Sequence, residues 1–154
     1  MQILKNIFTN NFEYVIIKLI KGVIMNLQKK FGEDVIVHWK DRKRWCGLPL
    51  SFTRYYIIEK PGKWIKLFCE IGFFTNRYEE VQLYRIEDFS MQRTLLNKIW
   101  GVASIVVKSN DRSAPTLNLT RIAKPYEVYD LISSLVTRDR KERNFRWSEF
   151  QDSI

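Results

Sequence analysis

The feature that most constrains this chain is the stretch from residue 52 to residue 120, in which short apolar runs alternate with polar residues and turns. Alternation with a period of two is typical of β-strands that bury one face, and no segment within this stretch has the length and pattern of a crossover helix. A turn is expected at Lys60-Pro61-Gly62, where proline restricts φ and glycine permits a positive φ. The pattern therefore predicts one curled antiparallel sheet, without parallel strands joined by helices.

A single long helix is predicted after the strands, from Pro125 to about residue 138. Proline suits a first helical position, and five apolar residues recur at helical spacing behind it. This stripe must be buried, and a helix can cover the open end of a strongly bent sheet. The segment 94–100 is predicted to be one helical turn or a wide loop, because it is too short for a stable helix. The stripe consists of Val128, Leu131, Ile132, Leu135 and Val136. The predicted strands before the helix are residues 33–39, 52–59, 63–71, 76–83, 86–92, 102–108 and 116–120.

Four segments, in this order along the chain, carry a family resemblance: Phe52-Thr53-Arg54-Tyr55, Gly72-Phe73-Phe74, EVQLYRIED from Glu80, and WGVASI from Trp100. Together they resemble the bacterial pleckstrin-homology (PH) domain family over roughly residues 34–143. The resemblance implies a mainly β fold, a half-open antiparallel barrel of about seven strands capped by a C-terminal helix. Bacterial members are known as ring-like homo-oligomers and as fusions to membrane segments. A fold of this kind is a scaffold with many uses, so the resemblance names no ligand.

Composition favours one packed, basic domain. Of the 154 residues, 45% are hydrophobic and 14% aromatic, which argues for a sizeable core and against global disorder. The net charge of +9 favours anionic partners without choosing among phospholipid, nucleic acid and acidic protein. Cys46 and Cys69 form no metal-binding or disulfide pattern. We therefore expect a cytoplasmic protein with reduced thiols, peripheral at the inner face of the membrane if it binds lipid.

The first 24 residues differ in character from the rest. They are apolar in places but interrupted by Glu13, Lys18 and Lys21, so they match neither a membrane span nor a signal peptide. The codons for Lys21 to Met25 can contain a ribosome-binding sequence just before a start codon. We expect residues 1–24 to be translated leader, with an amphipathic helix as the alternative. The predicted division is thus residues 1–24 as leader or extension, 25–143 as the PH-like domain, and 144–154 as tail.

The sequence offers little for catalysis. His38 is the one histidine, and the neighbouring carboxylates Glu79-Glu80 and Glu87-Asp88 point to opposite faces of a strand. The six glycines lie scattered, so no phosphate loop is present. We expect no enzymatic activity, no catalytic residues and no metal or other cofactor.

Two basic clusters are candidate binding sites. The first is a predicted loop over residues 40–49, where cations stand beside an indole that suits a membrane interface. In phosphoinositide-binding PH domains the same loop is basic, so the resemblance also implies this place. The second is the tail, where mixed charge favours a fraying helix end over a nucleic-acid site. The first cluster is Lys40, Arg42, Lys43, Arg44 and Trp45; the second is Arg138, Arg140, Lys141, Arg143, Arg146 and Trp147.

Three uses follow from these features. The first expectation is a non-catalytic binding domain that acts through a protein partner or self-assembly, because sheet edges and exposed aromatic residues can pair with another chain. The alternative is peripheral binding to anionic membrane lipid through the basic loop from Lys40 to Trp45. Nucleic-acid binding through the tail is the third and weakest expectation, and no small-molecule substrate is expected.

Overall fold

The computed structural model describes residues 29, 31–32, 34–72 and 77–152, with side chains as far as residue 144. The chain separates into two compact units, Met1–Val35 and Ile36–Ile154, and every element described below belongs to the second unit. The predicted leader at residues 1–24 lies outside the described residues.

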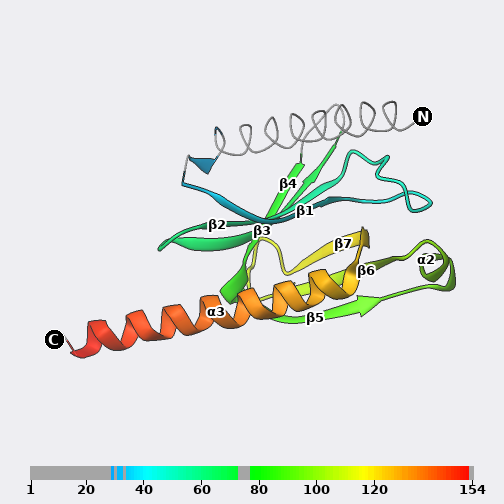
Figure 1. The fold of residues 1–154 in the computed structure, drawn as a ribbon. Coiled ribbons are helices and arrows are strands. Elements are labelled where there is room, and N and C mark those ends of the chain that lie inside the picture. Colours follow the sequence, from blue (N-terminus) through cyan, green and yellow to red (C-terminus); the bar gives the residue numbers. More distant parts are fainter. Residues whose placement is uncertain (1–28, 30, 33, 73–76, 153–154) are drawn as a thin grey trace, which may run out of the picture. The chain divides into compact units, whose positions relative to one another are not determined.

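Two antiparallel sheets and a long C-terminal helix form this unit (Figure 1). The first sheet contains four strands in chain order: β1 (Ile36–Arg42), β2 (Arg54–Lys60), β3 (Trp64–Ile71) and β4 (Arg77–Gln82). The second sheet contains three strands: β5 (Ile86–Gln92), β6 (Val102–Ser109) and β7 (Thr116–Ala123). Three helical segments complete the unit: the 3-10 helix η1 (Leu83–Arg85), α2 (Leu95–Ile99) and α3 (Pro125–Asp152).

The predicted fold class is confirmed. The unit is mainly β with one long helix at the C-terminal end, and its two sheets do not close into a continuous barrel. Strand β5 has the predicted bounds, and the segment 94–100 contains the single short helix α2. On β7, Leu117 and Leu119 are buried while Asn118 between them is exposed, as the alternation of the sequence predicts.

Helix α3 supplies one side of the hydrophobic core. Val128, Ile132, Leu135 and Val136 are buried in the same cluster as Ile57 and other inward-facing strand residues, while Leu131 packs at its margin. Burial of each such aliphatic side chain contributes roughly 1.5–3 kcal/mol. The predicted stripe therefore holds the helix on the sheets.

A buried carboxylate adds a polar anchor to this apolar packing. Asp139 is 2% exposed, and its two oxygens accept hydrogen bonds from the backbone N–H of Tyr84 in η1 (3.1 Å) and from Arg143 Nε (3.2 Å). The Arg143 guanidinium also stacks over the Tyr84 ring, 3.8 Å from its centroid. Asp139 thus fixes the middle of α3 to the connection between the two sheets.

Hydrogen bonds also join β1 to the end of β7. The backbone N–H of Arg44 donates to the carbonyl of Arg121 (2.9 Å), and Asp41 accepts from the backbone N–H of Ala123 (2.8 Å). Nearby, the Tyr55 hydroxyl of β2 accepts from the backbone N–H of Thr120 on β7 (2.9 Å). These bonds position the loop that follows β1.

Several predicted boundaries are wrong, among them the end of β7, which lies at Ala123 and not at residue 120. Two of them have a clear physical cause. Strand β1 ends at Arg42, three residues later than expected, because Lys40 and Arg42 pair with Tyr56 and Arg54 of β2. The polar composition of this segment favoured a loop, but the ladder with β2 decides where the strand ends. Helix α3 continues to Asp152 instead of fraying near residue 138, since no proline or glycine follows Pro125 and several of its polar residues contact the domain.

Candidate functional site

A tight turn after β1 places a tryptophan on the surface. Trp45 and Leu48 form an isolated antiparallel bridge, in which each backbone N–H donates to the other residue's carbonyl (2.8 and 2.9 Å). Between them Cys46 and Gly47 both have positive φ, 47° and 77°, which is the geometry of a type I′ turn. A non-glycine residue in this region costs roughly 1–2 kcal/mol. The turn holds the Trp45 side chain 60% exposed, with the Arg121 guanidinium 5.1 Å from its ring centroid.

The short helix α2 exposes apolar side chains beside this turn. Thr94 caps the helix by accepting the backbone N–H of Asn97, and the helix ends at Trp100. Leu95 and Ile99 are 78% and 76% exposed, and Leu96 and Trp100 are exposed as well. None of the five helix residues is buried, so α2 contributes no apolar side chain to the core.

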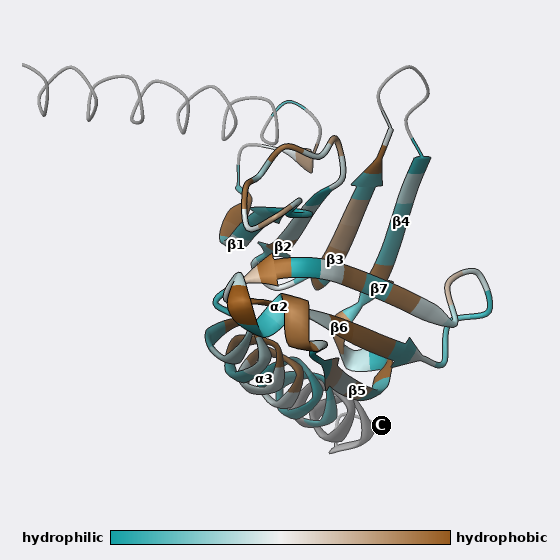
Figure 2. Cartoon of the chain, turned by 90° about the vertical axis from the view of Figure 1, so that its right-hand side faces the viewer, coloured by the Kyte–Doolittle hydropathy of each residue, from teal (hydrophilic) through white to brown (hydrophobic). Residues whose placement is uncertain are grey.

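The two segments meet and form one surface, which we call the apolar tip. A Cβ atom placed on Gly47 would lie 3.5 Å from the Trp100 carbonyl oxygen and 3.6 Å from its Cβ, so the turn packs against the end of α2. Figure 2 looks onto this end of the unit and shows the hydrophobic residues of α2 below the loop between β1 and β2. The apolar tip comprises Trp45, Leu48, Leu50, Leu95, Leu96, Ile99 and Trp100, all of them exposed.

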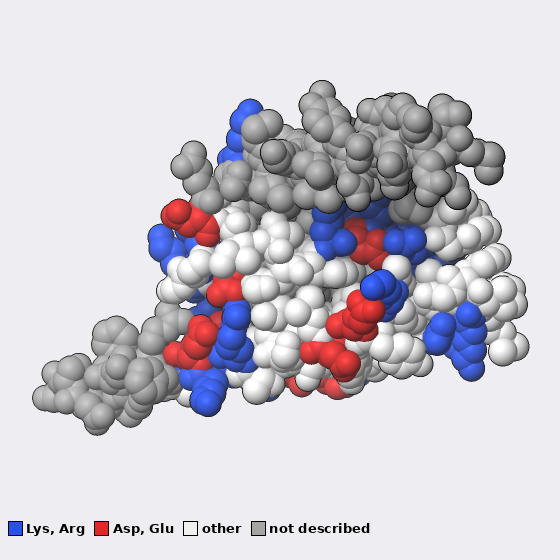
Figure 3. All heavy atoms as spheres, in the orientation of Figure 1, with Lys and Arg blue, Asp and Glu red and all other residues white. Residues whose placement is uncertain are grey.

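The apolar tip lies in a basic setting. No aspartate or glutamate occurs in residues 42–58 or 89–110, the stretches that contain both of its segments. Those stretches and the neighbouring end of β7 carry eight cations, among them Lys43, Lys98 and Arg121, while Asp41, just before the first stretch, pairs with Arg44. In Figure 3 the end of the molecule that carries α2 shows neutral and basic atoms without acidic ones. Such a surface suits an anionic partner that also has an apolar phase.

The structure separates the predicted loop residues into different roles. Lys40 and Arg42 lie on β1, and burial, followed by repulsion from Arg42 and Arg54, lowers the pKa of the Lys40 ammonium. Arg44 is largely structural, because its guanidinium bonds the Gly47 carbonyl (3.0 Å) and Asp41 (3.3 Å). Lys40 and Trp45 are the exposed members of the cluster and Lys43 is half-buried, and the neighbours of Trp45 on α2 were not predicted. The available signal was an apolar LLxxIW run in a segment too short to be buried as a helix.

The basic tail is helical, and its described arginines contact the domain. Arg138 pairs with Glu59, and Arg140 donates to the carbonyls of Tyr84 (3.4 Å) and Ile86. Arg143, already stacked on Tyr84, also reaches the Lys63 carbonyl (3.4 Å). Lys141 is exposed, whereas the side chains of Arg146 and Trp147 lie outside the described residues. The described arginines of the predicted cluster therefore bond to the domain and do not form one free basic stripe.

Glu59 on β2 joins the first sheet to α3. One of its oxygens bonds both His38 Nε2 (2.5 Å) and the Arg138 guanidinium. Burial raises the pKa of this carboxyl, but the hydrogen bonds from His38 and Arg138 outweigh burial, and the pKa is lowered overall. His38 thus has a packing and pairing role on β1.

The described residues offer no arrangement for metal chemistry, since no three His, Cys, Asp or Glu side chains within them come together as possible ligands. Burial, reinforced by the charge of Glu79, raises the pKa of the Cys69 thiol to about 12. A thiol with so high a pKa is a poor nucleophile at neutral pH.

The sheets and the capping helix define a mainly β scaffold with an exposed apolar tip. Comparison with protein families agrees: the model of the bacterial PH domain matches residues 45–136, which is more than half of the chain. The chain belongs to the bacterial PH domain family. No curated protein and no solved structure gives a significant match.

Membership of this family gives a general role. PH-type domains are as a rule non-catalytic modules that mediate interactions with proteins or lipids. The matched region begins at Trp45 and therefore contains the whole apolar tip. Among the described residues, no helix combines the length and the hydropathy needed to cross a bilayer.

Proposed function

We propose that this protein binds peripherally to the surface of anionic membranes, with the apolar tip as its contact. One observation carries the proposal: seven exposed apolar residues from two separate segments meet in a setting that is rich in cations, where the neighbouring carboxylate Asp41 is paired with Arg44. Exposed apolar surface of this kind marks an interaction site, because water solvates it poorly.

The chemistry of the apolar tip suits the boundary between headgroups and acyl chains. Leucine and isoleucine gain roughly 1.5–3 kcal/mol each when fully removed from water, and the exposed members of the tip retain most of that gain for binding. Tryptophan prefers the interface itself, because its ring is apolar while its N–H remains hydrated. Each nearby lysine or arginine adds about 1 kcal/mol at an anionic surface.

The main competing use of the same surface is association with a protein partner or with a second copy of the chain. A protein partner would use the apolar residues but would not require anionic lipid. Nucleic-acid binding has less support, because Arg138, Arg140 and Arg143 already contact the domain.

Sedimentation with vesicles tests the proposal. Wild-type protein is expected to sediment with phosphatidylglycerol vesicles at low salt, and much less with neutral phosphatidylcholine vesicles. The double variant Leu95→Ser/Ile99→Ser removes two highly exposed side chains, so it should lose most of the bound fraction without changing thermal stability. Tyr78→Ser is the matched control, because it removes an exposed ring from β4 on the other sheet.

Two results would contradict membrane binding. The first is equal sedimentation of wild type and the double variant. The second is wild-type protein that ignores vesicles but self-associates in light scattering through a contact that the double variant abolishes. That second result would assign the apolar tip to a homo-oligomer.

A further inference from the structure

An open pocket of about 560 Å³, which we call the cavity, lies at the other end of the second sheet from α2. It is bordered by η1, the start of β5, the turn between β6 and β7, and α3. Strands β5 and β6 run from this cavity to the apolar tip, and seven residues of strand span roughly 23 Å. A volume of this size is within the usual range for small-molecule sites, about 300–1,000 Å³.

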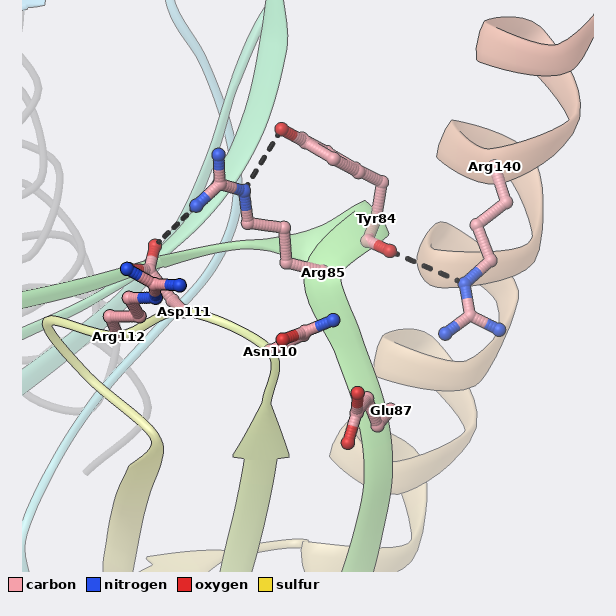
Figure 4. Close-up of a pocket in the computed structure, with 7 residues that line it drawn as sticks. All are labelled: Tyr84, Arg85, Glu87, Asn110, Asp111, Arg112 and Arg140. Carbon is pink, nitrogen blue, oxygen red and sulfur yellow. Dashed lines mark hydrogen bonds and ion pairs between the residues drawn. The ribbon is translucent and has the colours of Figure 1, made fainter.

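Three arginines from three separate segments line the cavity. Arg85 comes from η1, Arg112 from the turn between β6 and β7, and Arg140 from α3. Figure 4 shows Arg140 on one side of Asn110, with Arg85 and Arg112 on the other. Residues 85 and 112 are 27 positions apart in the sequence, and residues 112 and 140 are 28 positions apart. The fold therefore brings distant cations to one cavity.

Two of these guanidinium groups are held in place by the protein. Arg85 donates to the Tyr84 hydroxyl (3.0 Å) and to Asp111 (3.2 Å), while Arg140 donates to the carbonyls of Tyr84 and Ile86. A guanidinium has five N–H donors, and Arg85 and Arg140 each use two of them in these bonds. The remaining donors stay on side chains whose positions are already fixed, which lowers the entropy lost on binding.

The other charged residues that line the cavity are Arg112, Asp111 and Glu87. Arg112 is exposed and makes no hydrogen bond or ion pair within the described part of the chain. Asp111 is already occupied, because one oxygen accepts from Ser113 and the other from Arg85. Glu87 is the second carboxylate of the lining, so three guanidinium groups and two carboxylates line the cavity and leave one net positive charge.

We propose that this cavity binds a phosphate-bearing small molecule from solution. Planar guanidinium groups match the oxygens of phosphate with two parallel hydrogen bonds, and arginines on different segments can hold different faces of one anion. The apolar tip occupies the opposite end of β5 and β6, so the cavity is remote from the proposed membrane contact. The inference does not depend on membrane binding.

Calorimetric titration of the full chain with inorganic pyrophosphate at low ionic strength tests this site. Arg112→Ala should weaken binding about fivefold, because it removes a charged donor from a partly solvated anion. Glu87→Gln should strengthen binding about threefold, since it removes a like charge from the lining. Arg77→Ala is the matched control: it removes one exposed arginine from β4 of the first sheet and should leave the affinity unchanged.

Three outcomes would overturn the proposal. The first is that wild-type protein shows no heat of binding. The second is an equal loss of affinity in Arg112→Ala and Arg77→Ala, which would mean general attraction of the anion to a basic protein. The third comes from vesicles containing phosphatidic acid: loss of sedimentation in Arg112→Ala would assign the cavity to a lipid headgroup. The membrane proposal is tested separately, by vesicle sedimentation of the variant Leu95→Ser/Ile99→Ser, in which the residues of the cavity are unchanged.

Discussion

Replacement of Asp139 by alanine would test how helix α3 is held on the domain. This carboxylate is 2% exposed, although it lies within a segment that reads as a solvated basic tail. The replacement leaves the Tyr84 backbone N–H without its acceptor and releases the Arg143 guanidinium that stacks on the same tyrosine. Helix α3 would keep its apolar stripe but lose its polar connection to η1.

The magnitude follows from those two interactions. A buried donor left without a partner costs about 1–3 kcal/mol. The ion pair with Arg143 adds at most about 1 kcal/mol, because that arginine remains partly exposed to water and screening applies. We therefore expect Asp139→Ala to lower the free energy of unfolding by about 2–4 kcal/mol. Asp139→Asn retains one acceptor oxygen and should lose about half as much.

Urea unfolding followed by tryptophan fluorescence would measure the difference. The matched control is Asp130→Ala, which removes an exposed aspartate from the same helix and should change stability by less than about 0.5 kcal/mol. If Asp139→Ala and Asp130→Ala had the same small effect, the anchoring role of Asp139 would be refuted. A large loss in both variants would also refute it, because helix content alone would then explain the effect.

Two further predictions concern the core and the pH dependence of stability. Ile132→Ala removes a side chain that is 1% exposed at the centre of the stripe on α3, so it should cost about 2–5 kcal/mol in urea unfolding; a loss under 1 kcal/mol would show that α3 is not packed as described. The lowered pKa of Glu59 stabilises the folded state above the ordinary value of 4.5, and this contribution is lost as the pH falls through the lowered pKa. Glu59→Gln should therefore flatten the acid limb of the stability profile, and an unchanged limb would contradict the pairing with His38 and Arg138.

Much of the fold could be predicted because its signals are local or periodic. Alternation along β7 predicted which of Leu117, Asn118 and Leu119 would be buried, and the stripe on α3 predicted its buried face. The end of β1 was missed, because backbone pairing with β2 outweighs the polar composition of Lys40 and Arg42. A ladder depends on the partner strand, which composition does not describe.

The candidate site was predicted only in part. Trp45 was singled out as a candidate binding residue and is exposed in the structure, but its neighbours Leu95 and Ile99 lie about 50 positions further along the chain. Only the packing of Gly47 against Trp100 places them on one surface. The arginines of the cavity were likewise read as separate charges, because nothing local connects Arg112 to Arg140.

The amino-acid order by itself determined the class of architecture and the family, since hydrophobic periodicity and short matching segments are properties of neighbouring residues. Tertiary structure decided which polar groups form bonds within the domain and which stay available to a partner. In the sequence, Asp139 and Arg143 both belong to a charged segment that suggests exposure to solvent. In the structure, Asp139 is buried and Arg143 stacks on Tyr84. The physical reason is that burial and pairing depend on distances across the fold, and contacts between remote segments set those distances.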